Sequence, residues 1–273
     1  PRADELYART HVRGLAAMMR RFLLSLSLSI CGGAALADAS SIGDVPTLHL
    51  AGDSTLAEKR PEKRPETGWG EMLAAEFQPG TVLISNHARN GRSTRTFIAE
   101  GRWQSLLEGV KSGDYVLIQF GHNDQSIEKP DRYTPEADYR ANLDRFVSDV
   151  RQLNAIPVLL TPIARRRFDA QGRLLDSHGA YPDLVRTLAA ERQVVLIDMQ
   201  RRSEAVIQEA GEQGSKKLFL WLELGIDVNY PQGVSDNTHF SPAGAERMAD
   251  EFAAGLAGLD LPLARLLRSV PGD

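Results

Sequence analysis

Residues 48–54 read LHLAGDS, an apolar run that stops at a glycine, an aspartate and a serine. The run lacks the alternation of apolar and polar residues that marks a half-exposed strand, so it is typical of a strand covered on both faces. Gly52, Asp53 and Ser54 all favour tight turns. The stretch predicts a buried strand that ends in a turn and presents Ser54, either as a turn residue or as a nucleophile.

Four further apolar runs follow along the chain. They read TVLISN from Thr81, YVLIQFG from Tyr115, PVLLT from Pro157 and VVLID from Val194. Helical periodicity lies between the runs, most clearly over residues 135–154, with Thr134 as the predicted N-cap, and again after Ser241. Strands that alternate with helices predict a parallel sheet with helices on both faces. The predicted fold class is α/β, as a three-layer α/β/α sandwich.

The chain contains no long low-complexity linker, so we expect a single catalytic domain over residues 43–265. Residues 201–234 are long for a single crossover and predict a helix plus a loop beside the site. With 273 residues, of which 42% are hydrophobic, the chain can bury a full core. A net charge of −4 gives no basic domain of the kind that binds nucleic acid.

Residues 1–42 are expected to lie outside the fold. Residues 18–37 have a basic start, an apolar stretch and small residues before Asp38, which predict a signal peptide and a secreted or periplasmic protein. An uncleaved membrane anchor and a lipoprotein at Cys31 are the alternatives. Loss of residues 1–37 takes away five arginines and two acidic residues, so the charge falls from −4 to −7. We expect no stable membrane association after cleavage.

The residues that follow the predicted strands share one edge of the sheet, because the strands are parallel and their carboxyl ends lie together. In open α/β sheets, ligands bind at this edge. This edge carries Ser54, Gly91 and Asn123, and DNTHFSPAGA adds Asp236 and His239 late in the chain. Ser54 taken alone is an ordinary turn residue, and His239 an ordinary surface histidine. Their joint occurrence, each after a predicted strand or before a helix, favours a site over independent turns.

These residue types suit acyl transfer. A serine hydroxyl attacks an ester only when an imidazole takes its proton, and a carboxylate holds that imidazole in the required tautomer. We therefore expect Ser54, His239 and Asp236 to act together. The amides of Ser54 and Gly91 and the side-chain nitrogen of Asn123 are candidate oxyanion donors, and losing one such donor costs about 3 kcal/mol. No spaced set of metal ligands is present, so no metal or other cofactor is expected.

The order of these motifs resembles the four-block signature of the SGNH (GDSL-type) hydrolases. The blocks are Gly52-Asp53-Ser54, Gly91, GHND at residues 121–124 and DNTH at residues 236–239. Longer stretches, NGRSTRTFIAEGRW, IQFGHND, TPIARRRFD and DNTHFSPAGA, resemble the rhamnogalacturonan acetylesterase branch. The resemblance implies a flavodoxin-like sheet of strand order 2-1-3-4-5 and the same roles for the five residues.

The expected activity is removal of acetyl groups from a plant cell-wall polysaccharide, with rhamnogalacturonan first. An esterase of xylan or other acetylated sugars, a GDSL-type lipase or lysophospholipase, and a non-catalytic carbohydrate-binding protein remain as alternatives. The expected partner is the acetylated polysaccharide or oligosaccharide substrate, with no nucleic acid. Candidate substrate contacts are Arg92, Arg165, Arg166 and Trp221, because arginines suit a uronate-bearing chain and an indole can stack on a sugar ring.

Overall fold

The computed structural model describes residues 45–268, which belong to one compact unit. Its centre is a five-stranded parallel sheet of order β2-β1-β3-β4-β5. The strands are β1 (Thr47–Gly52), β2 (Leu83–Asn86), β3 (Tyr115–Gln119), β4 (Ile156–Leu160) and β5 (Val195–Ile197). Each predicted apolar run forms one of them, so the predicted fold class and strand order are confirmed.

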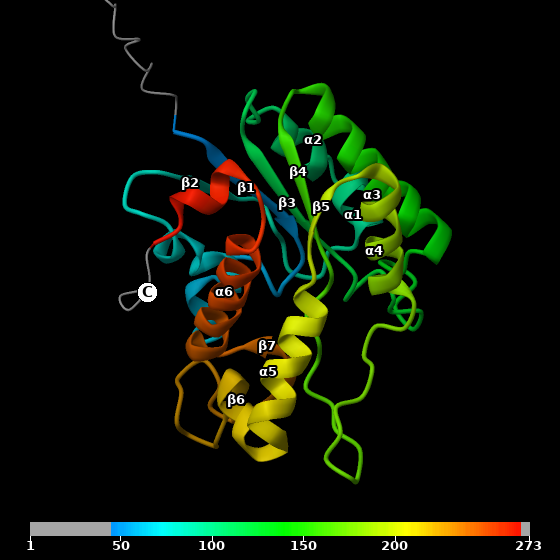
Figure 1. Ribbon diagram of the computed structural model, residues 1–273. Helices are drawn as coiled ribbons and strands as arrows, with labels where there is room; N and C mark the ends of the chain where they lie inside the picture. The colour runs from blue at the N-terminus through cyan, green and yellow to red at the C-terminus, as the bar shows by residue number, and fades with distance from the viewer. Residues whose placement is uncertain (1–44, 269–273) are drawn as a thin grey trace, which may run out of the picture. The chain divides into compact units, whose positions relative to one another are not determined.

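Helices cover both faces of this sheet (Figure 1). On one face, α1 (Thr94–Ala99), α2 (Arg102–Leu107), α3 (Glu136–Gln152) and α4 (Tyr181–Arg192) pack on alternate strand residues such as Val116 and Ile118. On the other face, α5 (Met199–Gly214) and α6 (Pro242–Ala257) pack on Leu117 and Leu160. Burial on both sides is the physical reason that the strands are apolar throughout.

Helix starts follow local sequence signals in part. Ser241 caps α6 through its side chain, which accepts a hydrogen bond from the backbone of Gly244. The prediction for α3 was one residue early: Pro135, rather than Thr134, occupies the N-cap position, with no side-chain cap. Thr134 is instead fully buried, and its carbonyl accepts a hydrogen bond from the Tyr181 hydroxyl.

The segment after β5 contains more structure than a helix and a loop. After α5 and a short 3-10 helix, β6 (Phe219–Leu222) pairs with β7 (Val234–Phe240) as an antiparallel hairpin outside the main sheet. The loop between them, residues 223–233, lies against the segment before the 3-10 helix at Trp69–Glu71, through hydrogen bonds from Asn229 to the carbonyls of Pro61 and Arg64. The predicted signal peptide and Cys31 fall outside the described residues.

The topology fixes where a site can form. β1 has β2 on one side and β3 on the other, so the chain reverses its direction of travel across the sheet at β1. Open α/β sheets bind ligands in the crevice at such a reversal, beyond the carboxyl ends of the strands. The turns after β1, β2 and β3 therefore converge there, and these are the turns that carry Ser54, Gly91 and Asn123.

Candidate active site

The turn after β1 is built to hold Ser54 in place. Asp53 Oδ1 accepts hydrogen bonds from the backbone and the hydroxyl of Thr55, both at 2.9 Å, while the Asp53 carbonyl accepts from Ala57. A Cβ on Gly52 would lie 2.9 Å from the carbonyl oxygen of Gln119 on β3, so only glycine fits between the two strands. The result is a buried, rigid serine at the strand end.

The histidine and the second aspartate come from a bulge in β7. Phe240 pairs with Phe219 of β6 and Ser235 pairs with Trp221, so only Leu220 faces residues 236–239 of the opposite strand. The extra length loops out, as in other bulges that re-aim side chains near sites. The sequence places these residues directly before the helix that follows Ser241. The structure places them in a bulged strand.

The three side chains form one hydrogen-bonded chain. His239 Nε2 lies 2.9 Å from Ser54 Oγ, and His239 Nδ1 lies 2.7 Å from Asp236 Oδ2. The other oxygen of Asp236 accepts from the backbone of Thr238 at 2.6 Å and of His239 at 2.9 Å. Burial raises the pKa of Asp236, but the hydrogen bonds and charge of His239 outweigh it and lower the pKa to about 2. Asp236 is therefore charged at neutral pH.

The two remaining predicted donors lie beside Ser54. Gly91 has φ of +76°, a left-handed conformation that favours glycine. Asn123 is buried, and its Nδ2 donates one hydrogen to the Arg92 carbonyl at 2.9 Å, which leaves the second hydrogen free to donate. Ser54, Gly91 and Asn123 line the same cavity as His239. The structure thus brings together all five residues of the predicted catalytic set: four line the cavity, and Asp236 contacts the far side of the His239 ring.

The cavity around Ser54 measures about 500 Å³, and cationic side chains predominate in its lining, although Arg92 and Arg132 also pair with Glu100 and Asp131 beside it. Every residue that lines it is polar, charged or glycine. Its positive side chains are Lys63, Arg92, Lys129, Arg132 and Arg165, whereas its only acidic side chain among the described residues is Glu66. Such a lining suits a polar ligand with negative charge.

Two of the predicted substrate contacts lie in the cavity and two do not. Arg92 and Arg165 line it, and Arg165 Nη1 donates to Thr238 Oγ1 at 2.8 Å. Arg166 is buried elsewhere, where its guanidinium lies 4.9 Å from the Trp221 ring and donates to Asn237 Oδ1 at 2.8 Å. Trp221 Nε1 donates to the same oxygen at 3.1 Å. Arg166 and Trp221 therefore hold the β6–β7 hairpin, and neither lines the cavity.

A second imidazole lies in the cavity wall. His122 Nδ1 is 3.3 Å from His178 Nε2, and both rings are buried. Burial, with the nearby His178 and Arg165, lowers the pKa of His122 well below its usual range. Burial likewise lowers the pKa of His178 to about 3. Both rings are therefore weak bases, and among the described residues only His239 has a ring nitrogen within hydrogen-bonding distance of Ser54 Oγ, at 2.9 Å.

Sequence reasoning missed several residues of the cavity region, among them four that bear on the site. Lys129 and Arg132 lie in the turn after β3, and Arg132 Nη1 is 3.5 Å from Asn123 Oδ1. Lys59 and Glu66 form a buried ion pair next to Ser54. Both belong to the run EKRPEKRPE, whose composition is typical of a solvated surface, so no sequence signal distinguishes them from their exposed neighbours.

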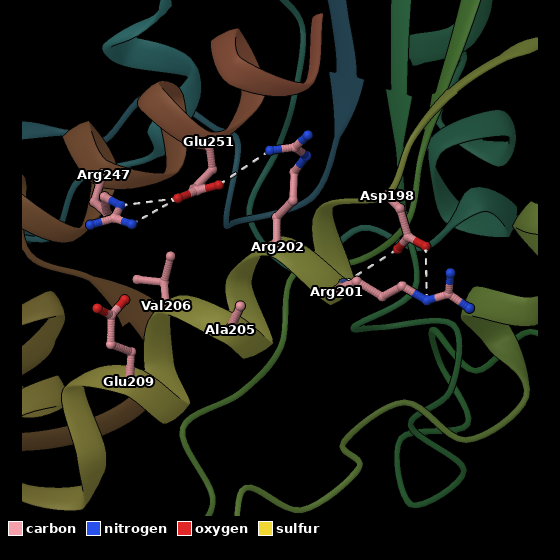
Figure 2. Close-up of a pocket in the computed structure, with 8 residues that line it drawn as sticks. All are labelled: Asp198, Arg201, Arg202, Ala205, Val206, Glu209, Arg247 and Glu251. Carbon is pink, nitrogen blue, oxygen red and sulfur yellow. Dashed lines mark hydrogen bonds and ion pairs between the residues drawn. The ribbon is translucent and has the colours of Figure 1, made fainter. Parts of the chain in front are cut away.

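A second hollow, of about 440 Å³, lies between α5 and α6 (Figure 2). Most of its charges are paired within it: Glu251 pairs with Arg202 and Arg247, and Asp198 pairs with Arg201. Within residues 45–268, no group of three or more His, Cys, Asp or Glu side chains could hold a metal ion. In the same range, no helix is long and apolar enough to cross a membrane.

The sequence profile of the GDSL-like Lipase/Acylhydrolase family matches residues 50–247, which span every motif described above. The chain belongs to this family. A rhamnogalacturonan acetylesterase of Bacillus subtilis, RhgT, is 42% identical over 223 residues, which cover 82% of this chain and 94% of that protein. The probable rhamnogalacturonan acetylesterase YesY of the same organism is 36% identical over 79% of this chain and 94% of its own length. The protein is a carboxylic ester hydrolase.

Solved structures agree on the fold. The crystal structure of YxiM from Bacillus subtilis superposes with a TM-score of 0.66 and 26% identity, over 77% of this chain and 56% of that one. A catalytic mutant of Axe2, an acetylxylan esterase from Geobacillus stearothermophilus, superposes with a TM-score of 0.58 and 20% identity, over 84% of this chain and 99% of its own. The Axe2 likeness at this identity establishes a shared fold and nothing finer.

Proposed function

We propose that the protein is a secreted serine esterase that removes acetyl groups from a plant cell-wall polysaccharide, first of all rhamnogalacturonan. The observation that carries the reaction type is the chain Ser54 Oγ, His239 Nε2, His239 Nδ1 and Asp236 Oδ2, with contacts of 2.9 and 2.7 Å. The identity of 42% with a rhamnogalacturonan acetylesterase supports the substrate.

In the first half of the reaction, Ser54 Oγ attacks the acetyl carbonyl carbon while its proton moves to His239 Nε2. Negative charge gathers on the carbonyl oxygen, where the amides of Ser54 and Gly91 and the Nδ2 of Asn123 donate hydrogen bonds. Asp236 stabilises the imidazolium from the Nδ1 side. Collapse of the tetrahedral intermediate breaks the ester bond, and His239 protonates the departing sugar hydroxyl.

In the second half, a water molecule replaces the sugar. His239 Nε2 takes a proton from this water, and the resulting hydroxide attacks the acetyl group on Ser54. The same three donors hold the second oxyanion. The intermediate collapses, Ser54 Oγ leaves with the proton from His239, and the acetic acid released ionises to acetate. The step sequence uses groups of this chain and water alone.

The cavity favours a charged sugar over a lipid. Five cationic side chains surround Ser54, and the wall presents no apolar side chain against which a long acyl chain would pack. A uronate-bearing polysaccharide fits this charge, and a neutral xylan gains nothing from it. A lipase or lysophospholipase, which needs an apolar acyl groove, is the weaker alternative. A non-catalytic binding protein would have no need of the Ser54–His239–Asp236 contacts.

Export is proposed from residues 18–37 alone, whose basic, apolar and small-residue order is that of a signal peptide. Expression of the full chain in a bacterial host and sequencing of the exported protein's N-terminus test it. A new N-terminus near Asp38 is expected. Retention of an unprocessed chain in the cell fraction contradicts the proposal.

The central test is acetate release from acetylated rhamnogalacturonan, homogalacturonan and xylan, measured side by side for the wild type, Ser54→Ala and His239→Ala. The wild type is expected to act fastest on rhamnogalacturonan, and each variant to lose roughly 10⁴-fold or more in kcat. Retention of most activity by either variant refutes the triad. A preference for long-chain 4-nitrophenyl esters over the acetate refutes the substrate class.

A further inference from the structure

Lys59 and Glu66 form a buried ion pair to which the proposed reaction gives no role. Lys59 Nζ lies 2.8 Å from Glu66 Oε1, and the two side chains are 1% and 7% exposed. Buried ion pairs add little to stability, because the loss of hydration offsets the attraction between the charges. The position of this pair, directly against Ser54 and His239, suggests a role in the site itself.

The lysine connects two turns that must be aligned for catalysis. Its ammonium donates to the Ser54 carbonyl and to Asn90 Oδ1, the latter at 3.0 Å. Asn90 directly precedes Gly91, whose amide is a proposed oxyanion donor. Lys59 therefore fixes the turn that carries the nucleophile relative to the turn that carries the donor.

The glutamate faces the histidine. Glu66 Oε1 lies 4.0 Å from His239 Nε2, the nitrogen that is also 2.9 Å from Ser54 Oγ. The same oxygen contacts the Lys59 ammonium at 2.8 Å, and at 4.0 Å from Nε2 its interaction with the imidazole is Coulombic rather than a hydrogen bond. When Nε2 accepts the Ser54 proton, the imidazolium lies between two carboxylates, Asp236 at Nδ1 and Glu66 near Nε2.

We propose that Lys59 and Glu66 are positioning residues of the esterase: Glu66 stabilises the protonated His239 from its Nε2 side, and Lys59 restrains Glu66 from displacing Ser54 as the partner of Nε2. This inference rests on the proposed Ser54–His239 mechanism. An unrestrained carboxylate 4 Å from an imidazolium would turn to accept its proton in a charge-assisted hydrogen bond. The contact with Lys59 keeps the charge close while leaving Nε2 to Ser54.

The charge state of Lys59 depends on the pair. Burial lowers the pKa of Lys59, and the charge of Glu66, followed by Asp53 and Glu71, raises it. Tyr230, on the β6–β7 loop, is also affected by the Glu66 carboxylate. Burial, and next the charges of Glu66 and Asp236, raise the pKa of its hydroxyl to about 12. The charged and titratable groups that face His239 and its carboxylates include Lys59, Lys63, Glu66, His122, Arg165, Tyr230 and Asp236.

Opposite charge changes at the pair should move the pH dependence of kcat/KM in opposite directions, measured with 4-nitrophenyl acetate. Glu66→Gln removes the negative charge, so the acidic limb is expected to move about one pH unit lower. Lys59→Met removes the positive charge and frees the carboxylate, so the limb is expected to move higher. Both variants should lose about tenfold in kcat, and the double variant should have its limb near that of the wild type.

Glu62→Gln is the matched control, since it makes the same charge change in the same segment with a side chain that is 61% exposed. Its profile should match the wild type. An acidic limb that stays in place in Glu66→Gln, or that moves in the same direction in both single variants, overturns the proposal in favour of a purely structural pair.

Folding of each variant is checked by circular dichroism. If Glu66→Gln does not fold, Glu66→Asp replaces it: the charge stays but withdraws by one methylene, so a smaller shift to lower pH is expected, and an unmoved limb overturns the proposal. Ser54→Ala distinguishes a failure of the proposed mechanism from a failure of the role proposed for Lys59 and Glu66. An active Ser54→Ala refutes the mechanism itself, whereas an inactive Ser54→Ala with an unmoved limb in Glu66→Gln refutes only the role of the pair.

Discussion

Asp236 and His239 lie in one bulge of β7, and Asp236 Oδ2 is 2.7 Å from His239 Nδ1. Two backbone amides of the same bulge bind the other carboxylate oxygen, so the bulge itself fixes the aspartate. In the tautomer that donates from Nδ1, the free Nε2 points at Ser54 Oγ. A local backbone irregularity thus sets both the orientation and the tautomer of the imidazole.

The first prediction follows from that tautomer. Asp236→Asn keeps the size of the side chain but removes its charge and can present a donor to Nδ1, which favours the wrong tautomer. Under the proposed mechanism kcat should fall roughly 10³- to 10⁴-fold with little change in KM. Steady-state kinetics on 4-nitrophenyl acetate measure both constants.

Asp260→Asn is the control for this variant, because Asp260 is fully exposed and far along the chain from the bulge. It should have wild-type kinetics. A loss of less than tenfold in Asp236→Asn would mean that His239 needs no charged partner, which contradicts the assignment of Asp236.

A second prediction concerns Asn123. Asn123→Ala removes the Nδ2 donor from the cavity, so kcat should fall about a hundredfold, the usual cost of one oxyanion donor. The variant also loses the hydrogen bond to the Arg92 carbonyl, which contributes to stability. Asn142→Ala, which loses the hydrogen bond from Nδ2 to Thr94 Oγ1, tests for that structural effect. Equal kcat losses in the two variants would rule out a special role for Asn123.

The main sheet was predictable because its inner strands β1, β3 and β4 are buried on both faces and therefore read as apolar runs, whereas the edge strand β2 is only half-buried. The β6–β7 hairpin was not predictable, since β7 reads VSDNTHF, a mostly polar sequence without strand periodicity. Four of its residues lie in the bulge rather than in regular pairing. Strand formation there depends on pairing with β6, a contact made across residues 223–233. Local sequence carries no record of that pairing.

The predicted site divides in the same way. Ser54, Gly91 and Asn123 follow predicted strands, so topology alone brings them to one edge. The arginines at 165–167 show the limit: Arg165 turns into the cavity, whereas the adjacent Arg166 turns to Trp221. The direction of each side chain depends on tertiary packing. For Lys59 and Glu66, burial is what separates them from the exposed charges around them.

A third prediction tests the charge of the cavity. Lys129→Met removes one of its cations, so KM for a uronate-bearing acetylated polymer should rise severalfold while kcat/KM for 4-nitrophenyl acetate stays the same. The effect should shrink as salt is added, because salt screens exposed charges. Lys111→Met, at the opposite end of the sheet, is the matched control and should change neither constant. Identical KM values for Lys129→Met and the wild type at low salt would contradict a charged subsite.

The last prediction concerns stability and pH at Asp124, which is fully buried beside the site. Its Oδ1 accepts hydrogen bonds from the backbone and hydroxyl of Thr94, at 2.9 and 2.6 Å. Its Oδ2 has no hydrogen-bond partner among the described residues. Burial raises the pKa of Asp124 to about 7, against the lowering effect of the Thr94 hydrogen bonds.

A carboxyl group whose pKa is higher in the folded state binds a proton on folding, so it lowers stability as pH rises. The folded protein should lose on the order of 3 kcal/mol from this group between about pH 4 and pH 7. Asp124→Asn keeps an oxygen for Thr94 but cannot ionise, so that part of the pH dependence should disappear. Urea unfolding at pH 5 and pH 8 measures it. The free energy of unfolding of the variant minus that of the wild type should be larger at pH 8 than at pH 5, because only the wild type is destabilised by ionisation of Asp124. An equal difference at both pH values would show that Asp124 does not titrate in this range.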